Sequence, residues 1–93
     1  MIKTFASKAT AALFAGLPVR QFGADVQRMA QRKLAMLNRA AHLNDLRIPP
    51  GNWLEALTGD RSGQYSIRIN DQWRICFRFQ AGDAYVVEIV DYH

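Results

Sequence analysis

The sequence predicts an α+β fold, in which a short amino-terminal strand and two helices are followed by a four-stranded antiparallel meander packed on the helices. Apolar residues recur at three- and four-residue spacing as far as residue 41, and at two-residue spacing from residue 53. Pro49-Pro50 lies between these regions and cannot continue a helix, because proline lacks a backbone donor. Ninety-three residues, 49% of them hydrophobic, suit one domain spanning residues 1–93.

The first elements are short. Ile2–Phe5 alternates in polarity and predicts a strand, and Ser7 is a suitable N-cap for a helix from about Lys8 to Ala15. Gly16 ends that helix. The glycines of residues 16–23 are typical of a loop, whose mobility a sequence does not reveal.

The second helix carries one apolar stripe and one basic row. The stripe comprises Val26, Met29, Ala30, Lys33, Leu34, Leu37 and Ala41. Arg28, Arg32 and Arg39 fall on the opposite side. Such a row contacts nucleic acid or an acidic partner, or is simply a solvated face, and the sequence leaves these alternatives open.

Four strands follow the proline pair, at Trp53–Leu57, Gln64–Ile69, Trp73–Phe79 and Ala84–Tyr92. The turns between them are predicted at Thr58–Gly63, Asn70-Asp71 and Gln80–Asp83. Connections this short join neighbouring strands, which predicts the antiparallel meander.

The two middle strands alternate apolar residues with arginines, so one face should receive the long helix and the other should be open. We expect Arg68, Arg74 and Arg78 on the open face. The last strand is apolar on both faces, as a central strand would be. Its expected inward residues are Tyr85, Val87 and Ile89, which leaves Glu88 to pair with one of the arginines. For Arg78, near the far turn, we favour a structural cross-strand role.

Net charge favours a polyanionic or acidic partner. The chain carries a formal charge of +4, and residues 1–45 hold seven Lys or Arg against two Asp or Glu. Nine of the twelve cations are arginine, whose planar fork suits phosphate and whose face stacks on bases. A small basic protein that binds no nucleic acid remains the alternative.

Several site classes are disfavoured. The single Cys76 excludes an internal disulfide, and it lies in a predicted strand as a small buried or half-buried side chain. His42 and His93 lie far apart, without paired carboxylates at ligand spacing, so we expect no metal site. His42 has no expected catalytic role. Without a signal sequence or membrane span, we expect a cytoplasmic protein that does not bind membranes.

The carboxyl terminus holds the strongest candidate site. Asp91-Tyr92-His93 places a carboxylate, a phenol and an imidazole at the end of the last strand. Histidine and a phenol with a lowered pKa span the range that proton transfer needs. Chains also simply end in polar residues, so a structural reading stays open. A shallow face with arginines, a tyrosine and a histidine suits a phosphodiester backbone better than a small molecule.

Gly59–Phe77, together with Glu88–His93, resembles the HigB branch of the RelE/ParE toxin superfamily. The likeness extends to Met1–Phe5 and Arg32–Leu37, and therefore spans nearly the whole chain. GraT-type members of that branch also share Pro49–Asn52 and the ending Val87–His93.

The resemblance implies a RelE-like fold and the toxin of a type II toxin–antitoxin pair. Such toxins are ribosome-dependent mRNA endoribonucleases, in which the 2′-hydroxyl attacks the adjacent phosphate without metal or cofactor. Implied partners are a cognate helix-turn-helix antitoxin (HigA-like), the 70S ribosome and mRNA. Operator DNA would be bound only through the antitoxin.

The same resemblance implies the site residues. Asp91, Tyr92 and His93 match the family's terminal active-site trio, and Arg74 matches its strand arginine beside the scissile phosphate. His93 would handle protons, Tyr92 would stack a base or share the proton work, and Asp91 would orient His93. Arg61 and Arg68 are weaker candidates for gripping the RNA backbone, and the helix row Arg28, Arg32 and Arg39 is a candidate for ribosomal RNA.

One departure concerns Glu55, which stands where better-studied relatives have histidine, while Thr58 stands where they have lysine. Glutamate can keep a general base but not a cation, so Glu55 is a catalytic candidate with slower cleavage or altered codon preference expected. Two alternatives are a non-cleaving toxin directed at gyrase or the ribosome, and a plain RNA-binding module.

Overall fold

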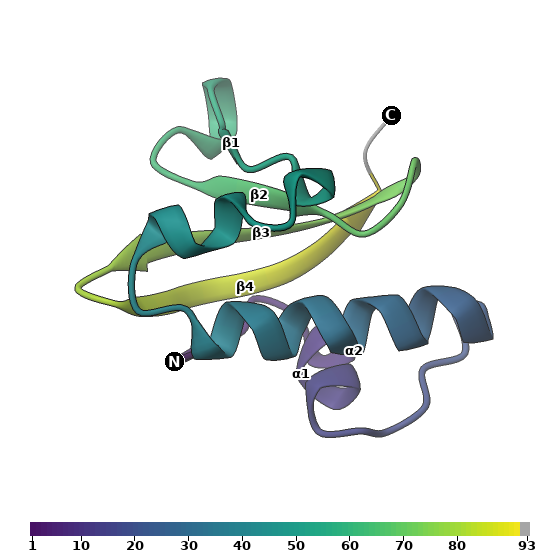
Figure 1. The fold of residues 1–93 in the computed structure, drawn as a ribbon. Helices are drawn as coiled ribbons and strands as arrows, with labels where there is room; N and C mark the ends of the chain where they lie inside the picture. Colours follow the sequence, from purple (N-terminus) through teal and green to yellow (C-terminus); the bar gives the residue numbers. More distant parts are fainter. Residues whose placement is uncertain (92–93) are drawn as a thin grey trace.

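The computed structural model describes residues 1–91, and it has the predicted α+β architecture. Two helices, α1 (Lys8–Phe14) and α2 (Ala24–Arg39), are followed by three short 3-10 segments, η1 (Leu43–Arg47), η2 (Pro50–Asn52) and η3 (Gly59–Arg61). The strands are β1 (Glu55–Ala56), β2 (Tyr65–Arg68), β3 (Trp73–Gln80) and β4 (Asp83–Asp91). They form one antiparallel sheet in the order β1-β2-β3-β4. In Figure 1, α1 and α2 lie together below the sheet. The edge strand β1 lies at the top of the view, away from both helices.

Local chemistry explains the helix boundaries. The Ser7 hydroxyl accepts the Thr10 backbone N–H at 3.1 Å, as an N-cap should, and α1 ends before Gly16 at φ 87°. In α2 the buried positions are Ala30, Leu34 and Leu37. Met29 of the predicted stripe is instead 38% exposed, because it lies at the margin of the face that meets the sheet.

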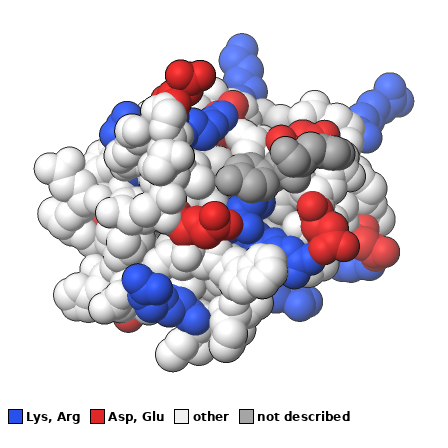
Figure 2. Space-filling model, turned by 90° about the horizontal axis from the view of Figure 1, so that it is seen from above, with Lys and Arg blue, Asp and Glu red and all other residues white. Residues whose placement is uncertain are grey.

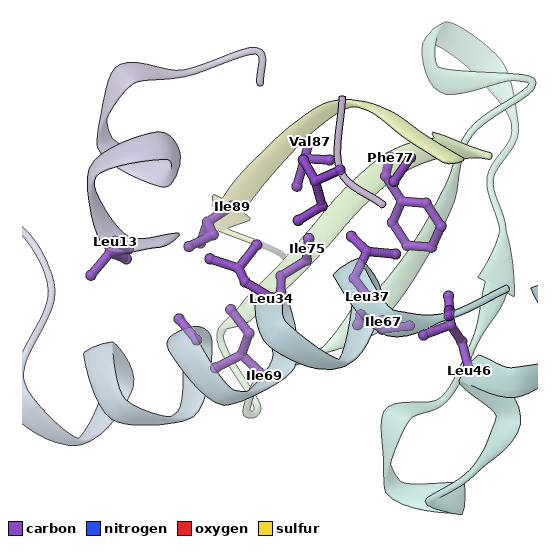
Figure 3. Close-up of a cluster of buried hydrophobic side chains, with 14 of the residues drawn as sticks. Leu13, Leu34, Leu37, Leu46, Ile67, Ile69, Ile75, Phe77, Val87 and Ile89 are labelled. Carbon is purple, nitrogen blue, oxygen red and sulfur yellow. The ribbon is translucent and has the colours of Figure 1, made fainter. Parts of the chain in front are cut away.

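The core lies between α2 and the sheet. Leu34 and Leu37 point at Ile67, Ile75 and Val87, all completely buried (Figure 3). Burying each side chain of this size contributes about 1.5–3 kcal/mol, and this layer is what fixes the position of β3 and β4.

The amino-terminal segment is not a continuous strand. It makes two parallel bridges, Ile2 with Ala84 and Phe5 with Val87, along the outer edge of β4. Between the bridges, the N–H of Val86 turns to the Thr4 hydroxyl at 2.8 Å, because Val86 adopts a left-handed φ of 48°. Strand β4 therefore lies between β3 on one side and the amino-terminal segment on the other, in agreement with the predicted central position.

The irregularity at Val86 corrects the predicted face of Tyr85. Cys76 pairs with Glu88 and Arg78 pairs with Tyr85, so an extra residue of β4 lies between the two pairs. Val87 and Ile89 face the core as expected, but Tyr85 shares the face of Arg78. The error arose because the strict two-residue alternation was carried through a bulge.

The two hairpin turns follow from their residues. Ala81 and Gly82 both have positive φ, 52° and 82°, which is the two-residue turn that best matches strand twist. Between β2 and β3, the Asn70 side chain accepts the N–H groups of Gln72 and Trp73 at 2.9 and 2.8 Å.

The connector after α2 is held by a buried amide. Asn52 is completely buried and donates from Nδ2 to the Leu46 carbonyl at 3.1 Å, while its Oδ1 accepts from the Lys33 ammonium. Burial, with a smaller effect of the Arg32 charge, lowers the pKa of Lys33 from its ordinary value. Trp53 follows in a left-handed conformation, so β1 begins two residues later than predicted.

Candidate functional site

Arg74 is the buried centre of the candidate site. Its side chain is only 6% exposed, although the sequence pattern placed it on an open face. The guanidinium Nε donates to Ser66 Oγ at 2.8 Å, and Nη2 donates to the Trp53 carbonyl at 2.5 Å. A buried guanidinium needs such acceptors, because burial of an unpaired charge costs several kcal/mol.

Glu55 provides the charged partner of Arg74. β1 pairs Glu55 with Ser66, and its carboxylate lies 3.2 Å from Arg74 Nη2. The carboxylate is half exposed, so solvent screens much of the attraction. The structure thus brings together two of the predicted catalytic candidates. Glu55 belongs to the two-residue strand β1, and its side chain reaches across β2 to Arg74 of β3.

A row of polar residues crosses the sheet beside Arg74. The register aligns Glu55, Ser66, Cys76 and Glu88 across the four strands. Glu88 does pair with an arginine, but the partner is Arg61 at 3.2 Å rather than a strand arginine. Arg61 also donates to Gln64 at 3.1 Å. Burial raises the pKa of the Cys76 thiol, which favours its protonated form.

Asp91 is the last residue of β4. The β3–β4 register pairs Arg74 with Val90 and Trp73 with Asp91, so Asp91 is one residue along from the partner of Arg74. Gln72 Nε2 donates to the Asp91 carboxylate at 3.2 Å. Tyr92 and His93, the other two residues of the predicted trio, lie outside the described residues 1–91.

The remaining strand arginines differ in their surroundings. Arg68 pairs with the Asp71 carboxylate, and its guanidinium carbon lies 5.7 Å from the ring centroid of Trp53. Arg78 is exposed, and its guanidinium lies over Gly63. Of the three arginines expected on one open face, Arg74 is therefore covered, Arg68 is half-buried and Arg78 is open to solvent.

The arginine row of α2 is separate from this centre. Arg28, Arg32 and Arg39 are all exposed, and Arg28 pairs with Asp25 in the first turn. Because α2 packs its apolar face on the sheet, the row points away from the sheet, whereas Glu55 and β1 lie at its far edge (Figure 1). The sequence pattern predicted this separation, because it placed the long helix and the strand arginines on opposite faces of the sheet.

Charge on the face that carries β1 is mixed. Figure 2 shows basic and acidic side chains interspersed across this face, rather than one continuous basic patch. The ion pairs Arg74–Glu55, Arg61–Glu88 and Arg68–Asp71 account for much of this mixing. Binding of a phosphate group here would therefore compete with carboxylates already in place.

Two contributors to the site were missed by sequence reasoning. Ser66 and the Trp53 backbone hold Arg74, and neither residue type suggests such a role. The signal for Ser66 was its position in the alternation, directly between the apolar Tyr65 and Ile67 on the arginine side. Nothing in the sequence indicates that the Trp53 carbonyl faces Arg74, because that depends on a left-handed φ of 45°.

Within residues 1–91, no group of three His, Cys, Asp or Glu side chains is arranged to hold a metal ion. The same part of the chain forms no enclosed pocket. No helix within it is long and apolar enough to cross a lipid bilayer.

Residues 3–93 match the family model for the RelE-like toxin of the type II toxin–antitoxin system HigB. The protein named Endoribonuclease HigB of Proteus vulgaris is 37% identical over 98 residues, covering both chains completely. Toxin HigB-1 of Vibrio cholerae is 49% identical over 53 residues, which cover 57% of this chain and 56% of that toxin.

A solved structure shares the fold. In the YoeB-YefM complex of Staphylococcus aureus, one chain superposes with a TM-score of 0.62 at 18% identity. The match covers 100% of this chain and 98% of that one. At this identity the likeness establishes the architecture alone.

Proposed function

Because the chain belongs to the HigB family of RelE-like toxins of type II toxin–antitoxin systems, we propose that it is an endoribonuclease that cuts mRNA on the ribosome. The observation that carries this proposal is the buried, pre-positioned Arg74, held by Ser66, Trp53 and Glu55 at the end of the strand pair that leads to Asp91. Fixed cationic donors stabilise charge that develops at a phosphate, since they need no reorganisation during the reaction.

The reaction we propose is attack of a substrate 2′-hydroxyl on its own adjacent phosphate. The new bond joins the 2′-oxygen to phosphorus, the bond to the 5′-oxygen breaks, and the products are a 2′,3′-cyclic phosphate and a free 5′-hydroxyl. One proton leaves the 2′-oxygen and one is delivered to the 5′-oxygen, so an acid and a base suffice and no metal is required. We assign proton transfer to His93, with Tyr92 sharing it or stacking a base and Asp91 orienting His93.

Glu55 should affect both phosphate binding and proton transfer at this centre. Its carboxylate lies against the guanidinium that would meet the phosphate, so binding must displace or protonate it. A carboxylate there can act as a base for the 2′-hydroxyl, while its charge weakens attraction for the phosphate. We therefore expect slower cleavage than in relatives with histidine at this position.

The partners we propose are an antitoxin with a helix-turn-helix domain, the 70S ribosome and mRNA. The structure from Staphylococcus aureus that shares this fold is a YoeB-YefM toxin–antitoxin complex, which supports an antitoxin partner. Operator DNA would be reached through that antitoxin. Arg61 and Arg68 would contact RNA only after exchanging their present partners Glu88 and Asp71.

The test is 5′-end mapping of mRNA in a reconstituted translation reaction. We would compare the native chain, a His93→Ala variant and a reaction without ribosomes, and would identify the ends of each fragment. Cuts that need both ribosomes and His93, with cyclic-phosphate and 5′-hydroxyl ends, are expected.

Other outcomes point elsewhere. Cuts without ribosomes would make the chain a free ribonuclease, and 5′-phosphate ends would contradict 2′-hydroxyl attack. Inhibited translation without any cuts would favour a non-cleaving toxin, as the Glu55 carboxylate beside Arg74 would allow.

A further inference from the structure

We propose that Trp53 is the platform on which a nucleobase of the substrate RNA stacks, next to the phosphate that Arg74 contacts. The proposal rests on the proposed function and names a substrate-positioning residue for it. Three observations lead to it: the exposure of the indole, its fixed backbone and its bond to Arg74.

The indole of Trp53 is unusually open. Its residue is 67% exposed, although tryptophan normally buries its large apolar surface in a core. Trp73, the other tryptophan, follows the usual pattern and packs edge-on against Phe22 with ring centroids 4.9 Å apart. The exposure of Trp53 is therefore a feature of its site rather than of the residue type.

The backbone of Trp53 is held in an unfavourable conformation. Its φ of 45° and ψ of 60° lie in the left-handed region, which costs a bulky residue about 1–2 kcal/mol. Such a conformation persists when the surroundings enforce it, and here the preceding Asn52 is completely buried and bonded to Leu46 and Lys33. The connector thus presents the indole to solvent from a fixed base.

The same residue anchors Arg74. The Trp53 carbonyl accepts a hydrogen bond from Arg74 Nη2 at 2.5 Å. The residue that carries the indole is therefore bonded directly to the guanidinium. The Arg68 guanidinium carbon lies over one face of the indole, 5.7 Å from the ring centroid, and adds a second cation there. A nucleobase would therefore stack on the opposite face or displace Arg68. An aromatic face next to two guanidinium groups is the combination that binds single-stranded RNA, because bases stack on the ring while cations meet the backbone.

An apolar side chain of the antitoxin could also cover an exposed indole. RNA is favoured because the backbone link to Arg74 would fix the distance between a stacked base and the phosphate, a constraint that an antitoxin contact does not require. With that distance fixed, the favourable free energy of stacking one base also holds the adjacent phosphate in a reactive orientation.

The experiment measures single-turnover cleavage of mRNA on programmed ribosomes. The variants are Trp53→Leu, which keeps an apolar side chain without a π face, and Trp53→Phe, which keeps a smaller aromatic ring. Trp53→Asn tolerates the left-handed backbone and retains the carbonyl that binds Arg74. Ile48→Ala is the matched control, since Ile48 lies in the same connector and is 74% exposed.

We expect Trp53→Leu and Trp53→Asn to cleave about 10- to 100-fold less efficiently, Trp53→Phe to recover most of the rate, and Ile48→Ala to match the native chain. All four should melt as the native chain does. Native-like cleavage by Trp53→Leu would overturn the inference and leave the indole as an antitoxin contact. Equal losses in Leu and Phe variants would overturn it in favour of a structural role. Absence of cleavage by the native chain would instead refute the proposed function.

Discussion

At the scale of single residues, Arg74 shows that strand alternation predicts the face on which a side chain lies but not its exposure to solvent. Alternation predicted its face correctly, but Arg74 is covered there by the Glu55 side chain and the Trp53 backbone. Since Ser66 Oγ, the Trp53 carbonyl and Glu55 meet Nε and Nη2 in a fixed geometry, an ammonium cannot satisfy all three acceptors. The planar fork, and not charge alone, is what the surroundings are built to hold.

Replacement of Arg74 by lysine should therefore reduce cleavage by about 10²- to 10³-fold, the range for losing one fixed donor in a charge-stabilising site. The measurement is the single-turnover rate on ribosome-bound mRNA, with thermal melting as a fold check. Arg78→Lys is the matched control, because Arg78 is four residues along the same strand and exposed. A folded Arg74→Lys chain that cuts at the native rate would contradict the assigned role.

At the scale of elements, η1 is started by a reciprocal cap. The Asp45 carboxylate accepts the backbone N–H groups of Ala41 and His42 at 2.9 and 3.0 Å, where η1 begins. These bonds, with that to His42 first, lower the pKa of Asp45 from its ordinary value of 3.8. A lowered folded pKa means that Asp45 stabilises the fold above its unfolded pKa, and that this contribution is lost as pH falls through the folded value.

The variant Asp45→Asn should thus be less stable than the native chain at pH 7, and the difference should shrink to nothing in acid. Urea unfolding of both chains at a series of pH values measures the free energy of unfolding directly. A difference that stays constant down to the lowest pH would show that the carboxylate charge has no part in the cap.

Elements also show what a sequence can and cannot predict. Helix α1 was predictable because Ser7 and Gly16 carry its boundaries, and the β2–β3 and β3–β4 turns were predictable from Asn70 and Gly82. The bulge at Val86 was not, because a β-branched residue gives no signal for a φ of 48°. It depends on Thr4, a residue 82 positions away that takes the displaced N–H.

At the scale of the whole molecule, the α2 arginine row and Arg74 lie apart, as the sequence pattern predicted. Helix α2 packs its apolar face on the sheet, so the α2 row points away from the sheet, whereas Glu55 of β1 reaches Arg74 across β2. The family resemblance singled out Arg74 and Glu55 as candidates, and the strand register brings them together. The sequence does not show which arginines remain exposed, because that depends on ion pairs that form only in the folded chain. Separate positions would let the proposed mRNA site and the α2 row contact different partners.

That arrangement predicts that the α2 row serves binding rather than chemistry. Changing Arg28, Arg32 and Arg39 to glutamate should abolish co-sedimentation with ribosomes at low salt, because contacts to RNA phosphates supply salt-dependent affinity. The matched control changes Lys3, Lys8 and Arg47 to glutamate, which alters net charge equally at other exposed positions. If both triple variants lose sedimentation alike, net charge alone explains binding. If the α2 variant sediments as the native chain does, the row is a solvated helix face, and ribosome contact must come from another surface.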